Sequence, residues 1–461
     1  YHVGGRSLIW GRQTYRLSDL DFEANSKDGY GVDWPIRYKD ISPWYDYVED
    51  YIGVSGEKLG IPHFPDGKFL KPLELNCAEK FLQEKISNEY DDRILTAARV
   101  AHITEGTKPG LGRVTCQNRN LCRRGCPYGA YFSSNSSTIP AAEATGNMTL
   151  RPHSIAYEIM YDENTKKATG VKVIDSETKV TYEYFAKVIF VCASTAGSTS
   201  ILMQSKSNRF PNGMGNDSGE LGHNLMDHHF LVGAGGYLDE FSDKISYGRR
   251  PGGIFVPRFR NVDNKSKMKK FLRGYGYQGG GGRGSKSIES VKEMESFGAK
   301  FKEMIVEPDK WNIGLSAFGE ILPRHSNRMY LNYSKKDKWG LPTITFDAKL
   351  SENEFEMRKD MKLQAQEMLE RSGVKGVYGY DNIQDYNFGH GIHEMGTARM
   401  GRDPKTSVLN SNNQIHDVKN VYVTDGSCMT SGGNQNPSIT YMALTARAVS
   451  HAVEELKKMN L

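Results

Sequence analysis

The stretch that decides how this chain folds is GIHEMGTARMG, residues 391–401, together with GGNQNPS, residues 432–438. Between them lies NVYVTDG at 420–426, a β-branched run that predicts a short strand ending in a turn. An apolar-periodic run from about 439 to 456 then predicts a long helix. The first stretch carries His393 and the last Asn436, and an imidazole beside an amide suits removal of a proton from an alcohol. Placed next to a hydride acceptor, this pair predicts an alcohol-oxidising site.

Length and composition describe a soluble globular chain of more than one domain. A chain of 461 residues is too long for a single core, so two interleaved domains are expected. The net charge of +5 is spread along the chain, and the short basic run at 264–270 is interpreted as a solvated loop, not a nucleic-acid site. No apolar run approaches the ~20 residues of a membrane span, so we expect no transmembrane segment.

Hydrophobic patterning separates two kinds of region. A meander followed by a buried strand is predicted between 148 and 192, with a helix over 193–205; a further amphipathic helix is predicted over 42–60. Residues 229–347 contain separate β-like pieces, followed by a helix with a Ser351–Glu354 capping box that stops at Gly373. These features predict an antiparallel sheet backed by a helix, and so a second domain.

A glycine motif at 274–279 matches the G-x-G-x-x-G pattern of dinucleotide-binding loops. Such a loop must follow a buried strand and open a helix. Here charged Lys269 and Lys270 precede the motif and further glycines follow it, so we interpret it as a loop or a glycine-rich strand. The chain opens on YHVGG with no initiator Met and no signal peptide. We expect that a dinucleotide fingerprint and any targeting signal lie in a preceding segment of the native protein.

Three of the six cysteines are clustered, with the spacing Cys116-x5-Cys122-x3-Cys126 followed by Pro127. Disulfides use pairs, and a structural zinc site needs a fourth ligand that this segment lacks. Three thiolates followed by proline favour an iron–sulfur cluster, and the nearby arginines favour an anionic centre. Zinc and purely structural cysteines remain as alternatives.

Four segments together resemble the glucose–methanol–choline (GMC) family of flavin oxidoreductases. They are GGRSLIW at 4–10, ASTAGS at 193–198, GHNLMDH at 222–228 and the block from His393 to Asn436. The resemblance implies an α/β fold in which a Rossmann-like FAD-binding domain, without its N-terminal strand–turn–helix, is interleaved with a substrate domain built on an antiparallel sheet backed by helices. We expect the FAD-binding domain at 1–15, 140–228 and 385–461, a cap or linker region with the three-cysteine loop at 16–139, and the substrate domain at 229–384.

Within the family the pattern is similar to bacterial glucoside 3-dehydrogenases and pyranose oxidases. This implies a catalytic pair of His393 as base and Asn436 as its partner, with hydride transfer from a sugar or glycoside hydroxyl, at C3 by resemblance, to FAD. Ile9 stands where some relatives carry a His that tethers FAD, so non-covalent FAD is expected. The cofactor-binding residues implied are Gly4, Gly5, Ser7, Trp10, Ile155, Ala193, Asp425, Gly426, Pro437, Ser438 and Ile439.

The resemblance also implies that electrons leave through a [3Fe–4S] cluster on Cys116, Cys122 and Cys126. A small partner subunit, a cytochrome-type electron acceptor and a bacterial, periplasmic location are expected on the same ground. Asn436 before Pro437 could also cap the helix that follows, His390 is a weaker candidate base, and His223 and His228 are expected to be structural. The alternatives are an oxygen-using pyranose or alcohol oxidase, or a sugar-binding protein without catalysis.

Overall fold

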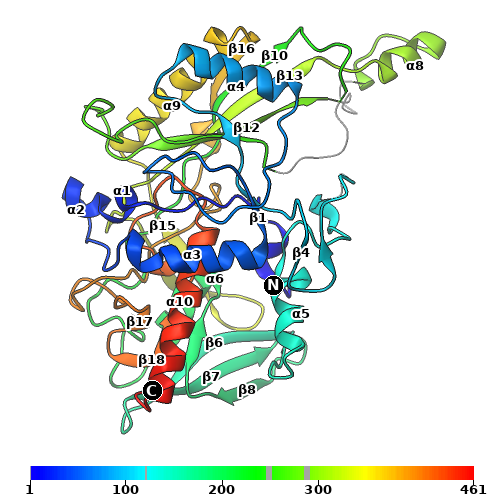
Figure 1. Cartoon of the computed structure of the whole chain (residues 1–461). Helices are drawn as coiled ribbons and strands as arrows, with labels where there is room; N and C mark the ends of the chain where they lie inside the picture. Colours follow the sequence, from blue (N-terminus) through cyan, green and yellow to red (C-terminus); the bar gives the residue numbers. More distant parts are fainter. Residues whose placement is uncertain (1, 120–121, 246–251, 285–290) are drawn as a thin grey trace.

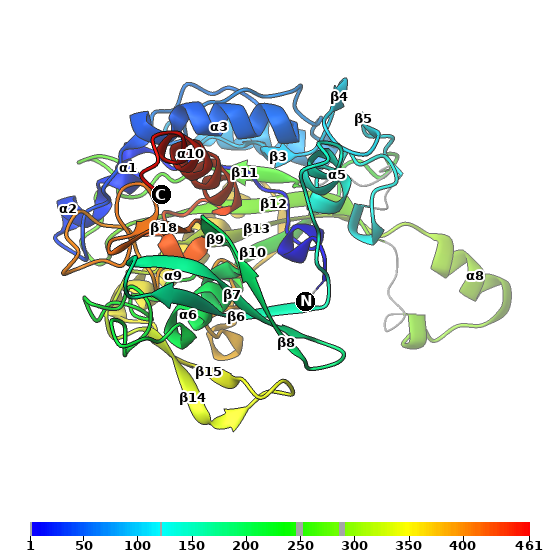
Figure 2. The same ribbon diagram turned by 90° about the horizontal axis from the view of Figure 1, so that it is seen from below.

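The apolar side chains of this protein gather in two large cores, each built around its own sheet. The computed structural model describes residues 2–119, 122–245, 252–284 and 291–461 (Figure 1). The two cores lie one above the other in Figure 1, with the long helices α3 (Tyr38–Ile52) and α10 (Ser438–Lys457) in the lower one. Figure 2 shows the same two helices side by side, and the Tyr45 hydroxyl lies 2.7 Å from the Thr440 hydroxyl between them.

The lower core contains a small sheet with the strand order β17 (Gln414–Ile415), β18 (Val418–Val423) and β9 (Ile189–Val191). β18 and β9 are parallel, and Val421 lies opposite Ile189. α6 (Ser194–Gln204) follows β9 directly, as expected for a strand–turn–helix unit. A meander of β6 (Ser154–Asp162), β7 (Lys167–Asp175) and β8 (Thr181–Phe185) lies beside it.

The upper core is built on a six-stranded antiparallel sheet. Its order is β16 (Lys375–Asp381), β10 (Val232–Leu238), β13 (Trp311–Gly319), β12 (Tyr275–Arg283), β11 (Ile254–Val256) and β2 (Thr96–Ala97). Helices α9 (Glu352–Arg371) and α4 (Cys77–Glu89) supply Met361 and Leu82 to the core on one face of this sheet. The other face is turned toward the lower part of the molecule.

Short elements connect these bodies. They are η1 (Gly5–Leu8), α1 (Asp19–Phe22), α2 (Ala24–Asp28), β1 (Val54–Ser55), β3 (Val100–Ala101), β4 (Thr107–Lys108), β5 (Arg113–Val114), η2 (Cys122–Arg124), η3 (Ser134–Ser136), α5 (Thr138–Glu143), η4 (Ile383–Asp385) and η5 (Gly426–Cys428). The hairpin of β14 (Arg328–Lys336) and β15 (Pro342–Asp347) pairs only with itself among the described residues. Helix α8 (Gly298–Val306) projects from the body in both ribbon views (Figures 1 and 2).

The predicted α/β class with an antiparallel second sheet is confirmed, whereas several local predictions were wrong. α3 begins at Tyr38, so Pro43 lies inside the helix and does not open it. The meander begins at Ser154 and includes no strand at 148–151. The glycine motif at 274–279 lies almost entirely in β12, which agrees with its interpretation as a glycine-rich strand and not as a dinucleotide-binding loop.

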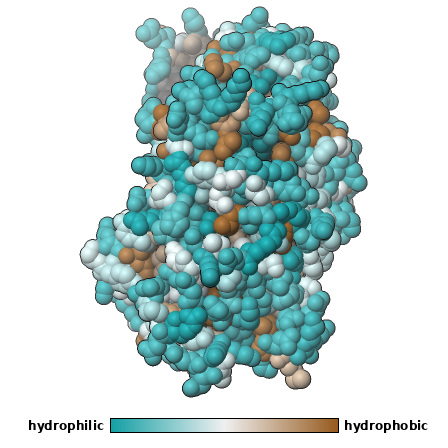
Figure 3. All heavy atoms as spheres, turned by 90° about the vertical axis from the view of Figure 1, so that its left-hand side faces the viewer, coloured by the Kyte–Doolittle hydropathy of each residue, from teal (hydrophilic) through white to brown (hydrophobic). Residues whose placement is uncertain are grey.

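The region expected as a cap or linker, 16–139, contributes to both cores. Its Leu17 and Ile52 pack in the lower core, whereas Leu82 and Leu95 pack under the six-stranded sheet. The predicted domain bounds remain predictions. The face seen in Figure 3 is mostly hydrophilic, with apolar residues in small separate patches. None of the helices in the described ranges has the length and apolar content that a bilayer crossing requires.

Candidate active site

The carboxylate of Asp227 holds the backbone of the loop that carries His393. Its Oδ2 accepts hydrogen bonds from the amides of Gly389 (2.8 Å) and Gly391 (3.1 Å), and its Oδ1 from those of His393 (3.0 Å) and His228 (2.8 Å). Burial raises the pKa of Asp227 to about 6, so the group is ionised at pH 7 and both oxygens accept. Bonds from amides to an ionised carboxylate are strong, so the loop is fixed. The sequence analysis gave Asp227 no role, although it directly precedes His228 in a segment that carried the family resemblance.

The structure brings the side chains of His393 and Asn436 together. Nε2 of His393 lies 3.2 Å from Nδ2 of Asn436, and both residues are buried. Gln278, on β12, donates its Nε2–H to Oδ1 of Asn436 at 2.5 Å. Because that oxygen accepts from Gln278, the NH₂ group of Asn436 faces His393. Gln278 was missed in the sequence because it lies within a glycine-rich run whose register only the sheet reveals.

His228 determines which nitrogen of His393 carries the proton. Nε2 of His228 lies 2.8 Å from the carbonyl oxygen of Gly433, which can only accept, so this nitrogen is protonated. In a neutral imidazole the other nitrogen, Nδ1, is then an acceptor. Nδ1 of His393 lies 2.9 Å from it and must be the donor. Nε2 of His393 is left with its lone pair, on the side where Asn436 presents a donor.

Both imidazoles are neutral at neutral pH. Burial lowers the pKa of His393 well below its usual value, and the positive charges of Arg6 and, at acidic pH, of a protonated His228 lower it further. Burial also lowers the pKa of His228 to about 4. A neutral imidazole with a free lone pair is the form that a general base requires.

Arg6 ties the glycine loop at the start of the chain to the His393 loop. Its guanidinium donates to both carboxylate oxygens of Glu394, at 2.5 and 3.0 Å, and to the carbonyl of Ile392 at 3.4 Å. Gly4 has a φ of 96°, a left-handed conformation that favours glycine, and it lies beside Gly5 at the start of η1. The predicted flavin-contacting loop therefore borders the His393 site.

Ser7 anchors the same loop to a neighbouring turn. Its hydroxyl donates to the Gly4 carbonyl at 2.5 Å and accepts from the Ser134 amide at 2.9 Å. The indole Nε1 of Trp10 is buried and has no hydrogen-bond partner among the described atoms, while Ile9 is 82% exposed. An exposed apolar side chain beside an unpaired buried donor fits a planar apolar group with polar edges, and so the residues present are compatible with a flavin ring.

Asp425 is the centre of a second polar cluster at the ends of β18 and β9. The Ser198 hydroxyl donates to its Oδ2, while its Oδ1 accepts from the amide and hydroxyl of Ser427 at 2.9 and 2.6 Å. The amide of Ala193 donates to Ser198 at 2.9 Å. A Cβ on Gly426 would lie 2.5 Å from the Glu394 carbonyl, so this cluster is packed against the His393 loop.

Asn436 does not cap α10, which was one reading of the sequence. The helix begins at Ser438 with Pro437 as the preceding residue, and no side chain bonds to its first amides. Asn436 instead directs its amide to His393 and Gln278. The positive N-terminal end of α10, with Ser438 and buried Ile439, therefore lies next to the pair.

Ile155 is the one predicted cofactor residue that the described contacts do not connect to this site. It lies on β6 opposite Ile174 of β7, with a half-buried side chain. No described hydrogen bond or ring contact joins it to the His393 or Asp425 groups.

Cys116, Cys122 and Cys126 form no disulfide and are partly buried. Burial raises the pKa of Cys116, and the nearby Cys126 contributes to this shift. Over the described ranges, which leave out 120–121, no group of three His, Cys, Asp or Glu side chains is arranged to hold a metal ion. The geometry as it stands does not form the predicted iron–sulfur site.

Comparisons with known proteins match most of the chain. A family profile described as GMC oxidoreductase matches residues 1–230, and its C-terminal counterpart matches residues 323–445. The chain is 28% identical to a 2-methyl-1,2-propanediol dehydrogenase of Mycolicibacterium austroafricanum, over 97% of this chain and 80% of that protein. It is 25% identical to the fructose dehydrogenase large subunit of Gluconobacter japonicus, over 99% of this chain and 81% of that protein.

Solved structures agree on the fold. A formate oxidase of Aspergillus oryzae RIB40 superposes with a TM-score of 0.64 at 13% identity, covering 99% of this chain and 84% of that chain. A pyridoxine 4-oxidase from Mesorbium loti gives a TM-score of 0.58 at 13% identity, with 97% and 82% covered.

Proposed function

Because the chain belongs to the GMC oxidoreductase family, and so is an FAD-dependent oxidoreductase acting on CH–OH groups, we propose that it is a dehydrogenase of sugars or glycosides. The hydroxyl oxidised is a secondary ring hydroxyl, at C3 by resemblance. His393 is the base and Asn436 its partner in this proposal.

One observation carries the proposal: Nε2 of His393 is unprotonated and faces the NH₂ group of Asn436, a hydrogen-bond donor. The tautomer follows from the bonds that link His393 to His228 and His228 to Gly433. A substrate hydroxyl placed between His393 and Asn436 would give its proton to the imidazole. The NH₂ group of Asn436 would then donate to the negatively charged oxygen. FAD, when bound, supplies the acceptor for the hydride that leaves the same carbon.

Replacing the base tests this assignment. His393→Ala should leave FAD bound but slow flavin reduction by substrate about 10²–10⁴-fold, because proton removal is lost. His390→Ala is the matched control: this exposed histidine lies three residues away and should keep the wild-type rate. The measurement is anaerobic stopped-flow bleaching of the flavin absorbance. Equal rates in His393→Ala and wild type would refute the role of His393.

The pH profile gives an independent check. The pKa of His393 is lowered, so the imidazole stays unprotonated below its usual titration range. The rate of flavin reduction should stay level as the pH falls through 6.5 and decline only at more acidic pH. A decline centred on pH 6.5 would show that the base is a solvated histidine.

Two alternatives have different signatures. An oxygen-using oxidase would form peroxide with each turnover; the paromamine 6'-oxidase of Streptomyces fradiae, 24% identical over 99% of this chain, is named as an oxidase. A protein that binds sugar without catalysis would purify without a flavin spectrum. Peroxide assays with a sugar panel and a visible spectrum separate these alternatives from the dehydrogenase.

The route of the electrons is part of the proposal. The spacing of Cys116, Cys122 and Cys126 supports a [3Fe–4S] cluster, together with the charge interaction of Arg12 with Cys122 and Cys126. Iron and acid-labile sulfide in anaerobically purified protein would support the cluster, and their absence would contradict this part of the proposal. A small subunit, a cytochrome-type acceptor and a periplasmic location stay predictions.

A further inference from the structure

The six-stranded sheet has two faces of opposite character. Trp311, Ile313, Leu315 and Ala317 of β13 are buried in the core beneath α4 and α9. The alternate residues of the same strand, from Asn312 to Phe318, are partly or fully exposed. Since successive strand residues point to opposite faces, the second face is the one turned away from this core.

This second face carries the active-site contacts. Gln278 of β12 bonds to Asn436, and the Phe318 ring of β13 has its centroid 6.0 Å from that of His393. Gln278 lies directly opposite Ser316 of β13, which in turn lies opposite Gly233 of β10. This row of the sheet therefore forms one wall of the site.

The next row along the strands has almost no side chains. Gly280 of β12 lies opposite Gly314 of β13, and Gly314 lies opposite Gly235 of β10. Gly282 continues the same face of β12. This row begins about 7 Å from Gln278, at two residues along the strand, and its three strands span about 10 Å.

Gly280, Gly282 and Gly314, which we call the glycine platform, are open to contact. A Cβ on Gly282 would meet no atom within 4 Å, and one on Gly314 would meet only backbone, at 3.4 and 3.8 Å. On Gly280 the nearest atom would be Oε1 of Glu79 at 3.4 Å. All three are partly exposed and have no left-handed φ. Backbone conformation does not require glycine at these positions, so the absence of side chains keeps the surface clear.

Aromatic hydroxyl groups border the platform. Tyr378 of β16 is 62% exposed and stands over Gly235, where its hydroxyl would lie 2.9 Å from a Cβ. Tyr380, two residues along, places its hydroxyl 2.5 Å from that of Ser316. Most strand residues that share this face are uncharged: Gly233, Gly235, Tyr237, Gly276, Gln278, Gly280, Gly282, Asn312, Gly314, Ser316, Phe318, Tyr378 and Tyr380. Lys375, opposite Tyr237 at the end of β10 away from Gly233, is charged. Exposed tyrosines and neutral hydrogen-bonding groups suit an uncharged polyhydroxyl ligand.

We propose that the glycine platform is a subsite for the part of an uncharged glycoside beyond the reacting ring, such as a second sugar ring. This inference rests on the proposed sugar oxidation and narrows its substrate class from sugars and glycosides in general to extended glycosides. The reacting ring lies at His393 and Asn436, and the second unit lies on the glycines beside Tyr378. The clear surface continues directly from the wall that bears Gln278, so one molecule can occupy both.

The test compares a disaccharide glycoside with its monosaccharide in anaerobic flavin reduction by the FAD-loaded enzyme. Gly314→Val adds a β-branched side chain that fits a strand but blocks the platform. It should lower kcat/KM for the disaccharide at least about tenfold, while the monosaccharide value stays within about twofold of wild type. Tyr378→Ala should act in the same direction without any change in the sheet backbone. Tyr330→Ala is its control, since this tyrosine is 43% exposed on the separate hairpin strand β14.

The outcomes separate the two proposals. The platform proposal is overturned if Gly314→Val and Tyr378→Ala change kcat/KM for the disaccharide and the monosaccharide by the same factor. It is also overturned if the wild type has a higher kcat/KM for the monosaccharide or a small diol. Alcohol oxidation stands in either case. If no hydroxyl compound reduces the flavin of the wild type, the proposed function itself fails, and the subsite with it. FAD content and the melting temperature of each variant show whether the fold is retained.

Discussion

At the scale of single residues, the role of His393 depends on a neighbour that the sequence did not single out. His228 was expected to be structural, yet its Nδ1 accepts a hydrogen bond from the protonated Nδ1 of His393 at 2.9 Å. Without that acceptor His393 could carry its proton on either nitrogen, and the fraction with a free Nε2 would fall. His228 is therefore a positioning residue that acts through His393.

Replacing His228 tests this positioning. In His228→Phe the acceptor is lost, and kcat should fall at least about tenfold with little change in KM. His228→Asn keeps an acceptor oxygen near the position of Nδ1 and should recover part of the rate. Because His228 lowers the pKa of His393 once it is itself protonated at acidic pH, the acid limb of the pH profile should move to higher pH in the Phe variant. A loss of stability alone would reduce both variants without moving the profile, and that result would contradict the positioning role.

The same scale shows what spacing reveals and what it hides. The identities and flanking residues of His393 and Asn436 were visible in the chain, because both lie in unusual glycine- and proline-containing stretches. Gln278 was missed because it has no distinctive local pattern, and Asp227 because its segment does not show which backbone amides its carboxylate binds. They are recruited by approach of chain segments more than 150 residues apart in sequence, as the bond between Gln278 and Asn436 shows.

At the scale of elements, the sequence predicted helix boundaries well where a capping box or a terminal glycine begins or ends the helix. α9 begins after Ser351, whose capping box with Glu354 is formed, and ends before Gly373. The amide of Gly373 bonds to the Glu370 carbonyl at 3.0 Å and that of Val374 to Leu369 at 3.1 Å. The start predicted for α3, at 42, was too late, because the capping contact between Arg37 and Asp40 begins that helix about one turn earlier.

Gly373 offers a measurement of this helix stop. It has a φ of 82°, and a Cβ there would meet no atom within 4 Å, so Gly373→Ala introduces backbone strain alone. We expect a loss of about 1 kcal/mol of unfolding free energy, seen as a lower melting temperature. Gly282→Ala is the control, since it has equal space and no left-handed φ, and its stability should be unchanged or slightly higher. An equal change of unfolding free energy in the two variants would refute the explanation by left-handed backbone strain.

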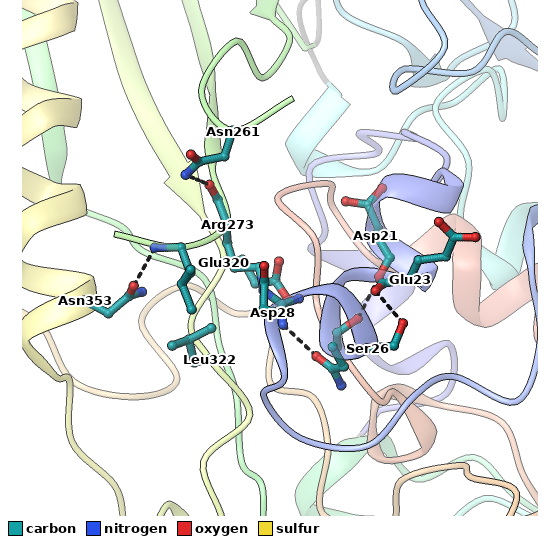
Figure 4. A network of polar contacts seen from close by, with 12 residues as sticks. Asp21, Glu23, Ser26, Asp28, Asn261, Arg273, Glu320, Leu322 and Asn353 are labelled. Carbon is teal, nitrogen blue, oxygen red and sulfur yellow. Dashed lines mark hydrogen bonds and ion pairs between the residues drawn. The ribbon is translucent and has the colours of Figure 1, made fainter. Parts of the chain in front are cut away.

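At the scale of the whole molecule, a buried ionic network joins the two bodies. Arg273, at the entry to β12, forms ion pairs with Glu320 at 3.1 Å and with Asp28 at 2.7 Å (Figure 4). It also donates a hydrogen bond to Oδ1 of Asn25 at 2.7 Å. Glu320 also accepts a hydrogen bond, at 3.2 Å, from the backbone amide of Gly432, which lies in the loop that leads to Asn436. The six-stranded sheet, the segment around α2 and the Asn436 loop are thus held by one set of charges.

Breaking this network should destabilise the whole molecule. Glu320→Gln removes the negative charge that faces Arg273. Because both side chains are only 1% exposed, the free energy of unfolding should fall by roughly 3 kcal/mol or more. Arg328→Ala, which breaks an ion pair exposed at 47% and 63%, is the control and should change stability by less than about 1 kcal/mol. Thermal and urea unfolding compare the two. A Glu320→Gln variant as stable as the control would show that the network is not a structural link.

By itself the sequence determined the family, the fold class and the pair His393 and Asn436, because these depend on glycines, caps and side chains at fixed spacings along one chain. Only the tertiary structure decided the protonation pattern of that pair, the bonds that Asp227 and Gln278 make, and the bare row of the sheet. Each of these depends on which residues of distant segments face one another, and register, burial and hydrogen-bond partners are set only when the segments pack.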